Sequence, residues 1–201
     1  IPVNFPAYYA RHPNKVVWLA HQHRAAYDGI DQPWSDIGLD DANHKAMAAT
    51  GVWRAGTETP ITLQEGNHTN PEEFKRTVAG LKNAYDNKVP LTYSTDADYF
   101  VPGRTRGEVA IDFIETWKAA GIPTADILRA MTINGYTVSE TETTRGPLKV
   151  GYAADIIAVN GNPLEKIDAV RDVRFVMKDG LVFKRDGVMT PAAFFNGGPV
   201  Y

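Results

Sequence analysis

The sequence contains no cysteine. A disulfide framework and a thiolate metal site are therefore both excluded, and any bound metal must be held by histidine and carboxylate ligands. The sequence also lacks an apolar run long enough to span a membrane, and its start shows no basic segment followed by an apolar core. We therefore expect a soluble protein with no membrane partner, either cytoplasmic or, after processing, secreted or periplasmic.

The chain has little excess charge of either sign. Its formal net charge is −3 at pH 7 and its pI is about 6.0. Nucleic-acid-binding domains usually cluster Lys and Arg on a basic face, so we expect no nucleic-acid partner. Of the 201 residues 43% are hydrophobic, which is enough to form a substantial core. The chain opens on Ile1 rather than Met, which we interpret as a processed chain or a fragment.

The first two thirds of the sequence alternate between strand and helix patterns. Three strands are predicted, at residues 16–20, 51–60 and 89–94. Helical patterns follow them, at residues 40–49, 70–85 and 107–120 and again from residue 123. This order predicts parallel strands covered by helices, and ligand sites in such folds lie at the carboxyl ends of the strands.

From residue 149 onward the pattern changes to short strands alone. They are predicted at residues 154–159, 173–178 and 181–184, and the pair Asp179-Gly180 favours a tight hairpin turn. These strands predict a small antiparallel sheet. Residues 187–201, with two Pro and several Gly, are predicted to form a terminal coil. The expected domains are therefore a βα region at 1–145, a sheet segment at 146–186 and a coil at 187–201.

The most informative segment is residues 91–98, an apolar strand that leads to a small residue, a hydroxyl and Asp96. A carboxylate at the end of a buried strand can take a proton from an attacking water and pass it to a leaving group. The alternative is that Asp96 caps a helix or a turn, which is ordinary chemistry for Asp. Next to it, Asp98 and Tyr99 could contact a substrate, or they could belong to a solvated loop.

A second candidate follows the strand predicted at 16–20. His21 and His23 are two residues apart, and on an extended chain such side chains point to the same side, so both could bind one metal. The alternative is that both are polar loop residues. His44, in the helix predicted at 40–49, is expected on its exposed side.

Three segments in a fixed order, residues 94–96, 120–134 and 146–164, resemble the closing portion of a metal-dependent amidohydrolase of the imidazolonepropionase-like or dipeptidase-like kind. The resemblance implies an α/β fold, namely the carboxyl-terminal part of a (β/α)8 barrel followed by a β-sandwich segment. It also implies that Asp96, in the Ser94-Thr95-Asp96 motif of the last strand, binds the metal and shuttles a proton. His21 would be a further ligand.

The resemblance implies a metal-dependent hydrolase of amide, cyclic amide or ester bonds in small substrates. A divalent metal such as zinc lowers the pKa of a bound water and so provides a hydroxide that attacks a carbonyl. The expected metal ligands are His21, His23 and Asp96, with Asp96 as the catalytic residue. Asp98 and Tyr99 are the expected substrate-binding residues.

Two departures from the family pattern lead to further expectations. Gln32 and Ser35 stand where the family places another metal-binding His. This favours an alternative function, a non-catalytic amidohydrolase-like binding or assembly protein without a complete metal site. A full barrel takes about 250 residues, and this chain has βα material for only part of one. Because an incomplete barrel exposes strand edges, we expect a partner, either the remainder of the barrel or another copy of the chain.

Overall fold

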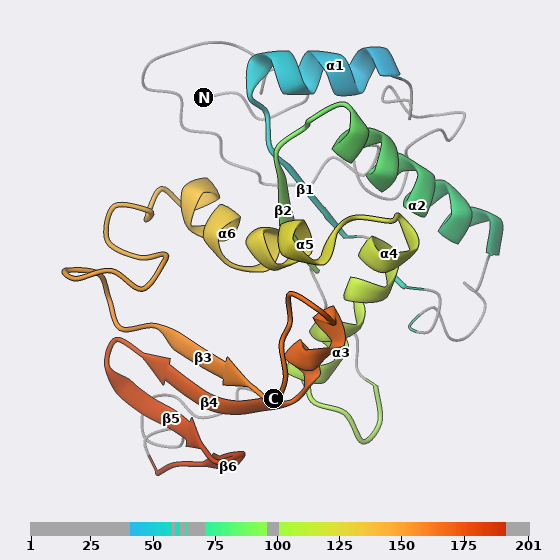
Figure 1. Ribbon diagram of the computed structural model, residues 1–201. Helices are drawn as coiled ribbons and strands as arrows, with labels where there is room; N and C mark the ends of the chain where they lie inside the picture. Colours follow the sequence, from blue (N-terminus) through green and yellow to red (C-terminus); the bar gives the residue numbers. More distant parts are fainter. Residues whose placement is uncertain (1–40, 58, 61–62, 64–70, 96–100, 192–201) are drawn as a thin grey trace.

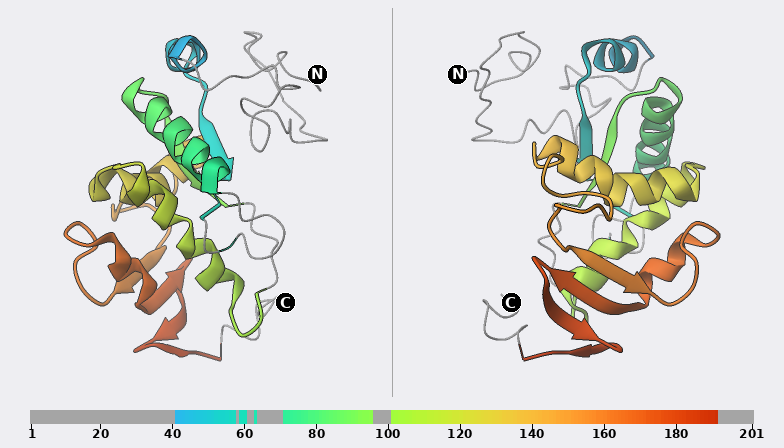
Figure 2. Two further views of the ribbon diagram at one scale, coloured as in Figure 1. Left: turned by 90° about the vertical axis from the view of Figure 1, so that its right-hand side faces the viewer. Right: turned by 60° about the vertical axis from the view of Figure 1, so that its left-hand side comes forward.

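The computed structural model describes residues 41–57, 59–60, 63, 71–95 and 101–191 (Figure 1). Its elements form two regions. Helices and two parallel strands make up the first, and an antiparallel sheet makes up the second. In each view of Figures 1 and 2 the sheet lies at the lower end of the molecule, below most of the helices. The mixed helix and strand fold expected from the sequence is therefore present.

The first region begins with a repeated helix and strand. Its elements are α1 (Asp41–Thr50), β1 (Arg54–Thr57), α2 (Pro71–Asp86) and β2 (Leu91–Ser94). The two strands pair in parallel, with Arg54 opposite Leu91 and Thr57 opposite Ser94. The prediction of parallel strands is thus confirmed, although both strands are shorter than their predicted ranges. The strand predicted at residues 16–20 lies outside the described residues.

Helix α2 follows the local rules by which it was predicted. Pro71 occupies its first position, where a missing N–H is tolerated, and Glu72 and Glu73 place negative charge in the first turn. Its buried face carries Leu81 and Ala84. The chain then turns directly into β2, because Val89 N–H donates to the Ala84 carbonyl at 3.0 Å.

The helix predicted at residues 107–120 is divided in the structure. It forms α3 (Arg106–Asp112) and α4 (Ile114–Ala119), which meet at Phe113. At the junction Thr116 N–H donates to the Phe113 carbonyl, a bond three residues back rather than four. Upstream, Thr105 and Glu108 form a reciprocal capping box that fixes the start of α3. The single-helix prediction was therefore wrong at Phe113.

Two further helices, α5 (Thr124–Met131) and α6 (Ile133–Val138), pack on β2. The hydrophobic core lies where β2, α2, α4 and α5 meet, and its largest completely buried members are Leu81, Ile114, Trp117 and Ile127. The Tyr93 ring packs on it, with its centroid 5.8 Å from that of Trp117. Each such side chain contributes about 1.5–3 kcal/mol through burial. No helix among the described residues is long and apolar enough to cross a membrane.

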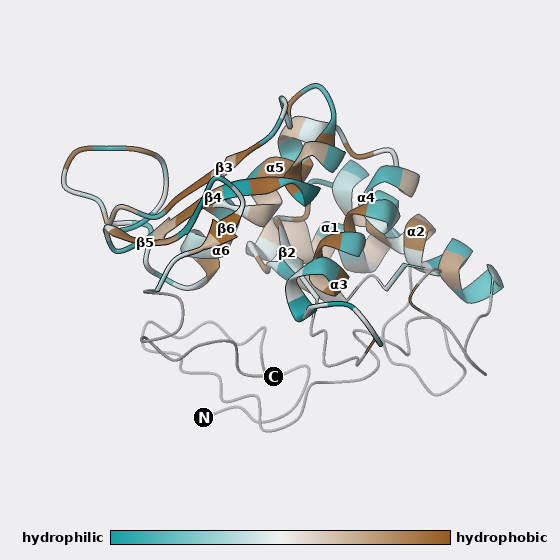
Figure 3. Cartoon of the chain, turned by 90° about the horizontal axis from the view of Figure 1, so that it is seen from below, coloured by the Kyte–Doolittle hydropathy of each residue, from teal (hydrophilic) through white to brown (hydrophobic). Residues whose placement is uncertain are grey.

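The second region is a four-stranded antiparallel sheet. Its strands are β3 (Ile156–Val159), β4 (Val173–Lys178), β5 (Leu181–Arg185) and β6 (Val188–Met189), and the 3-10 helix η4 (Ile167–Arg171) connects the first two. Strand β3 is hydrophobic along its length (Figure 3), yet Ile157 is 65% exposed. The sheet therefore leaves much of its apolar surface uncovered within the described part of the chain.

The hairpin turns of this sheet depend on positive φ angles. Asp179 and Gly180 have φ values of +51° and +79°, so the predicted Asp-Gly turn is present. The terminal segment differs from its prediction, because residues 188–189 form β6 rather than coil. A second Asp-Gly pair, Asp186 and Gly187, supplies the turn before β6 with φ values of +52° and +82°.

Candidate functional site

The carboxyl edge of the parallel strand pair is where the sequence predicts the site. Strands β1 and β2 run in the same direction and end together, since Thr57 lies opposite Ser94 (Figure 1). Segments leaving the two strands therefore start at the same edge. The predicted residues Asp96, Asp98 and Tyr99 follow this edge in the sequence and lie outside the described residues, as do His21 and His23. Their roles stay predictions.

Strand β2 is held by side chains along its length. Asn134 Nδ2 donates to the Leu91 carbonyl at 2.7 Å, and Thr92 Oγ1 donates to the Ala130 carbonyl at 3.4 Å. On the following residue, the Tyr93 hydroxyl donates to the Ala110 carbonyl at 2.6 Å. These contacts tie the strand to α3, α5 and α6. Three consecutive residues of the strand are therefore tied to the helices before the strand ends at Ser94.

No group of three His, Asp or Glu side chains in the described part of the chain is arranged to hold a metal. The prediction for His44 was wrong, since this side chain is 3% exposed rather than on a solvent face. Its Nε2 lies 3.5 Å from Arg54 Nη1, and the same guanidinium reaches the Gly80 carbonyl of α2. Packing of α1 against α2 and the start of β1 buries His44, which the sequence of an isolated helix does not reveal.

Asp112 is the centre of an ionic cluster that joins the two regions. Its Oδ2 accepts from Arg104 and its Oδ1 accepts from Arg171 of η4, each at 2.5 Å. Burial acts to raise the pKa of the Asp112 carboxyl, but the hydrogen bonds and charges of the two arginines outweigh burial and lower the pKa below its ordinary value. Arg171 also pairs with Glu115 at 2.7 Å. The sequence analysis did not identify this cluster, because Arg171 is 59 residues from Asp112 in the chain.

A second carboxylate, Asp155, links two segments of the antiparallel region. It accepts hydrogen bonds from the Asp179 backbone N–H at 2.8 Å and from the Arg145 guanidinium, which also pairs with the Asp179 side chain. The Asp179 N–H, more than the Arg145 charge, lowers the pKa of the Asp155 carboxyl. This arrangement ties the segment before β3 to the hairpin turn after β4. It leaves Asp155 no chemical role at the carboxyl edge.

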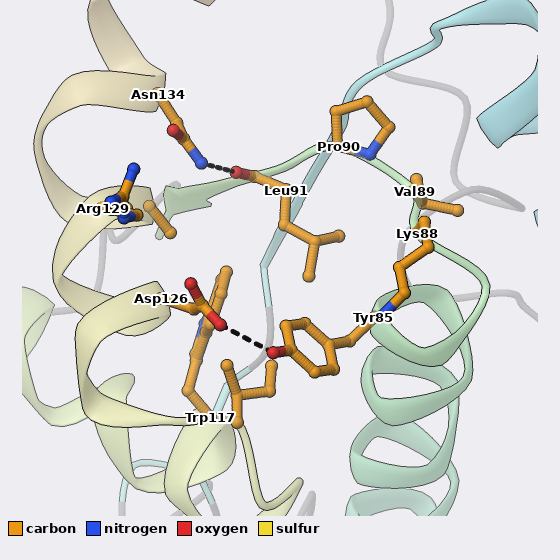
Figure 4. A pocket seen from close by; sticks show the side chains of 11 residues that line it. Tyr85, Lys88, Val89, Pro90, Leu91, Trp117, Asp126, Arg129 and Asn134 are labelled. Carbon is orange, nitrogen blue, oxygen red and sulfur yellow. Dashed lines mark hydrogen bonds between the residues drawn. The ribbon is translucent and has the colours of Figure 1, made fainter.

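The described residues also form a pocket at the opposite end of β2. It lies between α2 and α5, with Leu91 and Trp117 among the residues that line it (Figure 4). Across the pocket the Tyr85 hydroxyl donates to Asp126 Oδ2 at 2.6 Å. This hydrogen bond is the main reason that the pKa of Tyr85 is raised above its ordinary value. The pocket lies at the amino end of β2, away from the carboxyl edge at which the strand ends at Ser94.

Comparison with known proteins identifies the family. The model of the amidohydrolase family matches residues 18–182, most of the chain, so this chain belongs to the amidohydrolase family. The resemblance seen in its sequence is thereby confirmed. No curated protein sequence matches it.

Solved structures of this family have a similar fold. A Xaa-Pro dipeptidase with methionine bound in its active site gives a TM-score of 0.60 and 23% identity over 72% of this chain and 37% of that one. A. niger ochratoxinase gives a TM-score of 0.58 and 23% identity over 74% of this chain and 36% of that one. A prolidase complexed with N-methylphosphonate-L-proline gives a TM-score of 0.52 and 20% identity over 79% of this chain and 40% of that one. The chain therefore spans about two fifths or less of each of these structures.

Proposed function

We propose that this chain is the carboxyl-terminal part of a metal-dependent hydrolase that cleaves amide, cyclic amide or ester bonds in small substrates. The observation that carries the proposal is the pair of parallel strands that end together, in a chain of the amidohydrolase family, immediately before the segment that contains Asp96. In this proposal β1 and β2 are strands of an incomplete (β/α)8 barrel, and the antiparallel sheet is one part of a β-sandwich.

The donor set predicted from the sequence fits a zinc-like divalent cation. Such a cation accepts imidazole nitrogen and carboxylate oxygen, which are the atoms that His21, His23 and Asp96 would supply. A bound metal would lower the pKa of a water molecule and polarise the carbonyl of the substrate. Gln32 and Ser35 supply no imidazole, so any further ligand would come from the rest of the barrel or from a second copy of the chain.

The protein's own contribution to the chemistry is proton transfer and orientation. In the proposal Asp96 takes the proton of the attacking water and delivers it to the leaving nitrogen or oxygen. The strand that precedes it is fixed by Asn134, Thr92 and Tyr93, and this support would hold the carboxylate in one position. Asp98 and Tyr99 would contact the substrate.

Amide bonds of dipeptide-like molecules are the substrate class that the neighbours favour. One neighbour is a Xaa-Pro dipeptidase, and another is a prolidase that binds N-methylphosphonate-L-proline. Both similarities are below 25% identity and support the fold, so the substrate class is part of the proposal.

Metal content tests the proposal directly. Elemental analysis of the purified protein should find a divalent metal. A chelator should remove this metal, and the protein should then no longer hydrolyse a panel of dipeptides. His21→Ala should lose the metal, whereas the matched variant His12→Ala, outside the proposed ligand set, should retain it. Metal loss from both variants, or from neither, would contradict the ligand assignment.

The alternative function is a binding or assembly protein that keeps the fold without a complete metal site. The presence of Gln32 and Ser35 at the position of a family ligand favours it. A metal-free protein that hydrolyses no member of the panel, yet binds a small molecule tightly, would establish this alternative.

A further inference from the structure

The pocket at the amino end of β2 has the size of a small-molecule site. Its volume is about 340 Å³, and binding pockets for small molecules range from about 300 to 1,000 Å³. It opens between the end of α2, the residues that lead into β2, and helices α4 and α5 (Figure 4). The strand runs away from it toward the carboxyl edge. The pocket is therefore separate from the carboxyl edge of β2, where the strand ends at Ser94.

The pocket combines mainly apolar walls with charged side chains of both signs. The walls are mainly apolar, and they include Val89, Leu91 and Trp117, all of which are buried in the core. Two cations, Lys88 and Arg129, and one carboxylate, Asp126, add charge to this lining. A ligand that fits such a site needs an apolar body and charged groups of both signs.

The carboxylate and the guanidinium are both available to a ligand. Asp126 uses Oδ2 for the Tyr85 hydroxyl, and no described residue donates a hydrogen bond to its Oδ1. Arg129 is exposed one helical turn further along α5, and no carboxylate in the described part of the chain forms an ion pair with it. Lys88 Nζ lies 5.5 Å from the centroid of the Tyr85 ring, which places its charge on the same side of the pocket as that ring.

We propose that this pocket binds a free α-amino acid with an apolar side chain. The ammonium group pairs with Asp126 Oδ1, the carboxylate pairs with Arg129, and the side chain packs on the partly exposed ring of Tyr85. Charge-assisted hydrogen bonds of this kind are about twice as strong as neutral ones, so both charged ends of the ligand contribute to recognition. The site stands independently of the proposed hydrolysis, although dipeptide cleavage would produce ligands of this class.

The proposal is tested by calorimetric titration of the intact protein with L-phenylalanine. Phenylalaninamide lacks the carboxylate and 3-phenylpropionate lacks the ammonium, so each should bind at least about tenfold more weakly. Arg129→Gln should weaken L-phenylalanine binding about tenfold but leave phenylalaninamide binding unchanged. Asp126→Asn, which keeps an acceptor for Tyr85, should weaken L-phenylalanine in the same way and leave 3-phenylpropionate unchanged.

Two controls separate this pocket from other sites. Lys82→Gln removes an exposed cation of α2 that does not line the pocket, and it should bind L-phenylalanine as the unchanged protein does. Asp96→Asn should also bind L-phenylalanine as the unchanged protein does. If the amino acid bound at the catalytic segment and not in this pocket, Asp96→Asn would weaken its binding. Absence of L-phenylalanine binding, equal binding of the three compounds, or loss of binding in Asp96→Asn but not in Arg129→Gln would overturn the proposal.

Discussion

The βα region and the antiparallel sheet bury their apolar residues to very different degrees. In the βα region Leu81, Phe113, Ile114 and Ile127 are all completely buried. In the sheet, by contrast, Ile157, Leu181, Val188 and Met189 are all exposed, and only η4 sends residues into the common core. Packing therefore stabilises the βα region, whereas hairpin turns, strand pairing and ion pairs carry more of the sheet's stability.

The largest expected effect comes from truncating aliphatic side chains of equal size in the two regions. Leu81→Ala leaves a cavity in a close-packed core and should lower the free energy of unfolding by about 2–5 kcal/mol. Ile157→Ala removes a side chain that is already mostly in water, and it should cost less than about 1 kcal/mol. Denaturant unfolding followed by circular dichroism measures both. Equal losses would mean that the sheet is covered in solution.

A smaller loss is expected when the connection between the regions is cut. Asp112→Ala removes the carboxylate that Arg104 and Arg171 share, and should lower the free energy of unfolding by about 2–3 kcal/mol. The matched variant Asp86→Asn breaks the exposed pair with Lys82 on α2 and should cost less than about 0.5 kcal/mol. Thermal unfolding of the two variants under the same buffer compares them. Similar small losses would show that the cluster does not hold the sheet in place.

The same carboxylate predicts how stability changes with pH. The pKa of Asp112 is lower in the folded protein than in the unfolded chain. Its contribution to folding stability is therefore complete above its pKa in the unfolded chain, and is lost as the pH falls through its pKa in the folded protein. Stability of the unchanged protein should therefore fall below about pH 4. Asp112→Asn should reduce the slope of that fall, which urea unfolding between pH 5 and pH 2 measures. An unchanged slope would contradict the pairing with Arg104 and Arg171.

The smallest effect concerns a single turn of the sheet. Gly180 has φ of +79°, so Gly180→Ala should destabilise the protein by about 1 kcal/mol. Gly107 lies in α3, and a Cβ added there would meet no atom within 4 Å, so Gly107→Ala should instead stabilise the protein by about 0.4–1 kcal/mol. Opposite shifts of the unfolding midpoint are therefore expected. A shift in the same direction for both would mean that backbone conformation does not decide the outcome.

The fold was predictable where local chemistry determines structure. Pro71, the acidic first turn and the spacing of apolar residues were enough to place α2, and Asp179-Gly180 was enough to place a hairpin. Asp186-Gly187 carries the same turn signal, and it would have predicted β6. The burial of His44 depends on packing against Arg54 and α2, and local patterns within its own helix do not contain these contacts.

The candidate site was predictable only in part. The sequence correctly placed a strand before Ser94-Thr95-Asp96, because its apolar run is short and ends at polar residues. It gave no indication of the pocket between Tyr85 and Asp126 or of the cluster around Asp112. Both join residues that are dozens of positions apart, and only the packing of helices on β2 and η4 brings them together.

Steady-state hydrolysis of a dipeptide substrate by Asp96→Asn, with metal content measured on the same sample, examines the proposed proton shuttle most directly. The side-chain amide of Asn cannot accept the proton of the water and return it as the carboxylate of Asp96 would. Turnover should therefore fall by about 10²- to 10⁴-fold. Asp86→Asn, an exposed carboxylate on α2, serves as the control and should retain full turnover. Unchanged turnover and unchanged metal content in Asp96→Asn would contradict the assignment of Asp96.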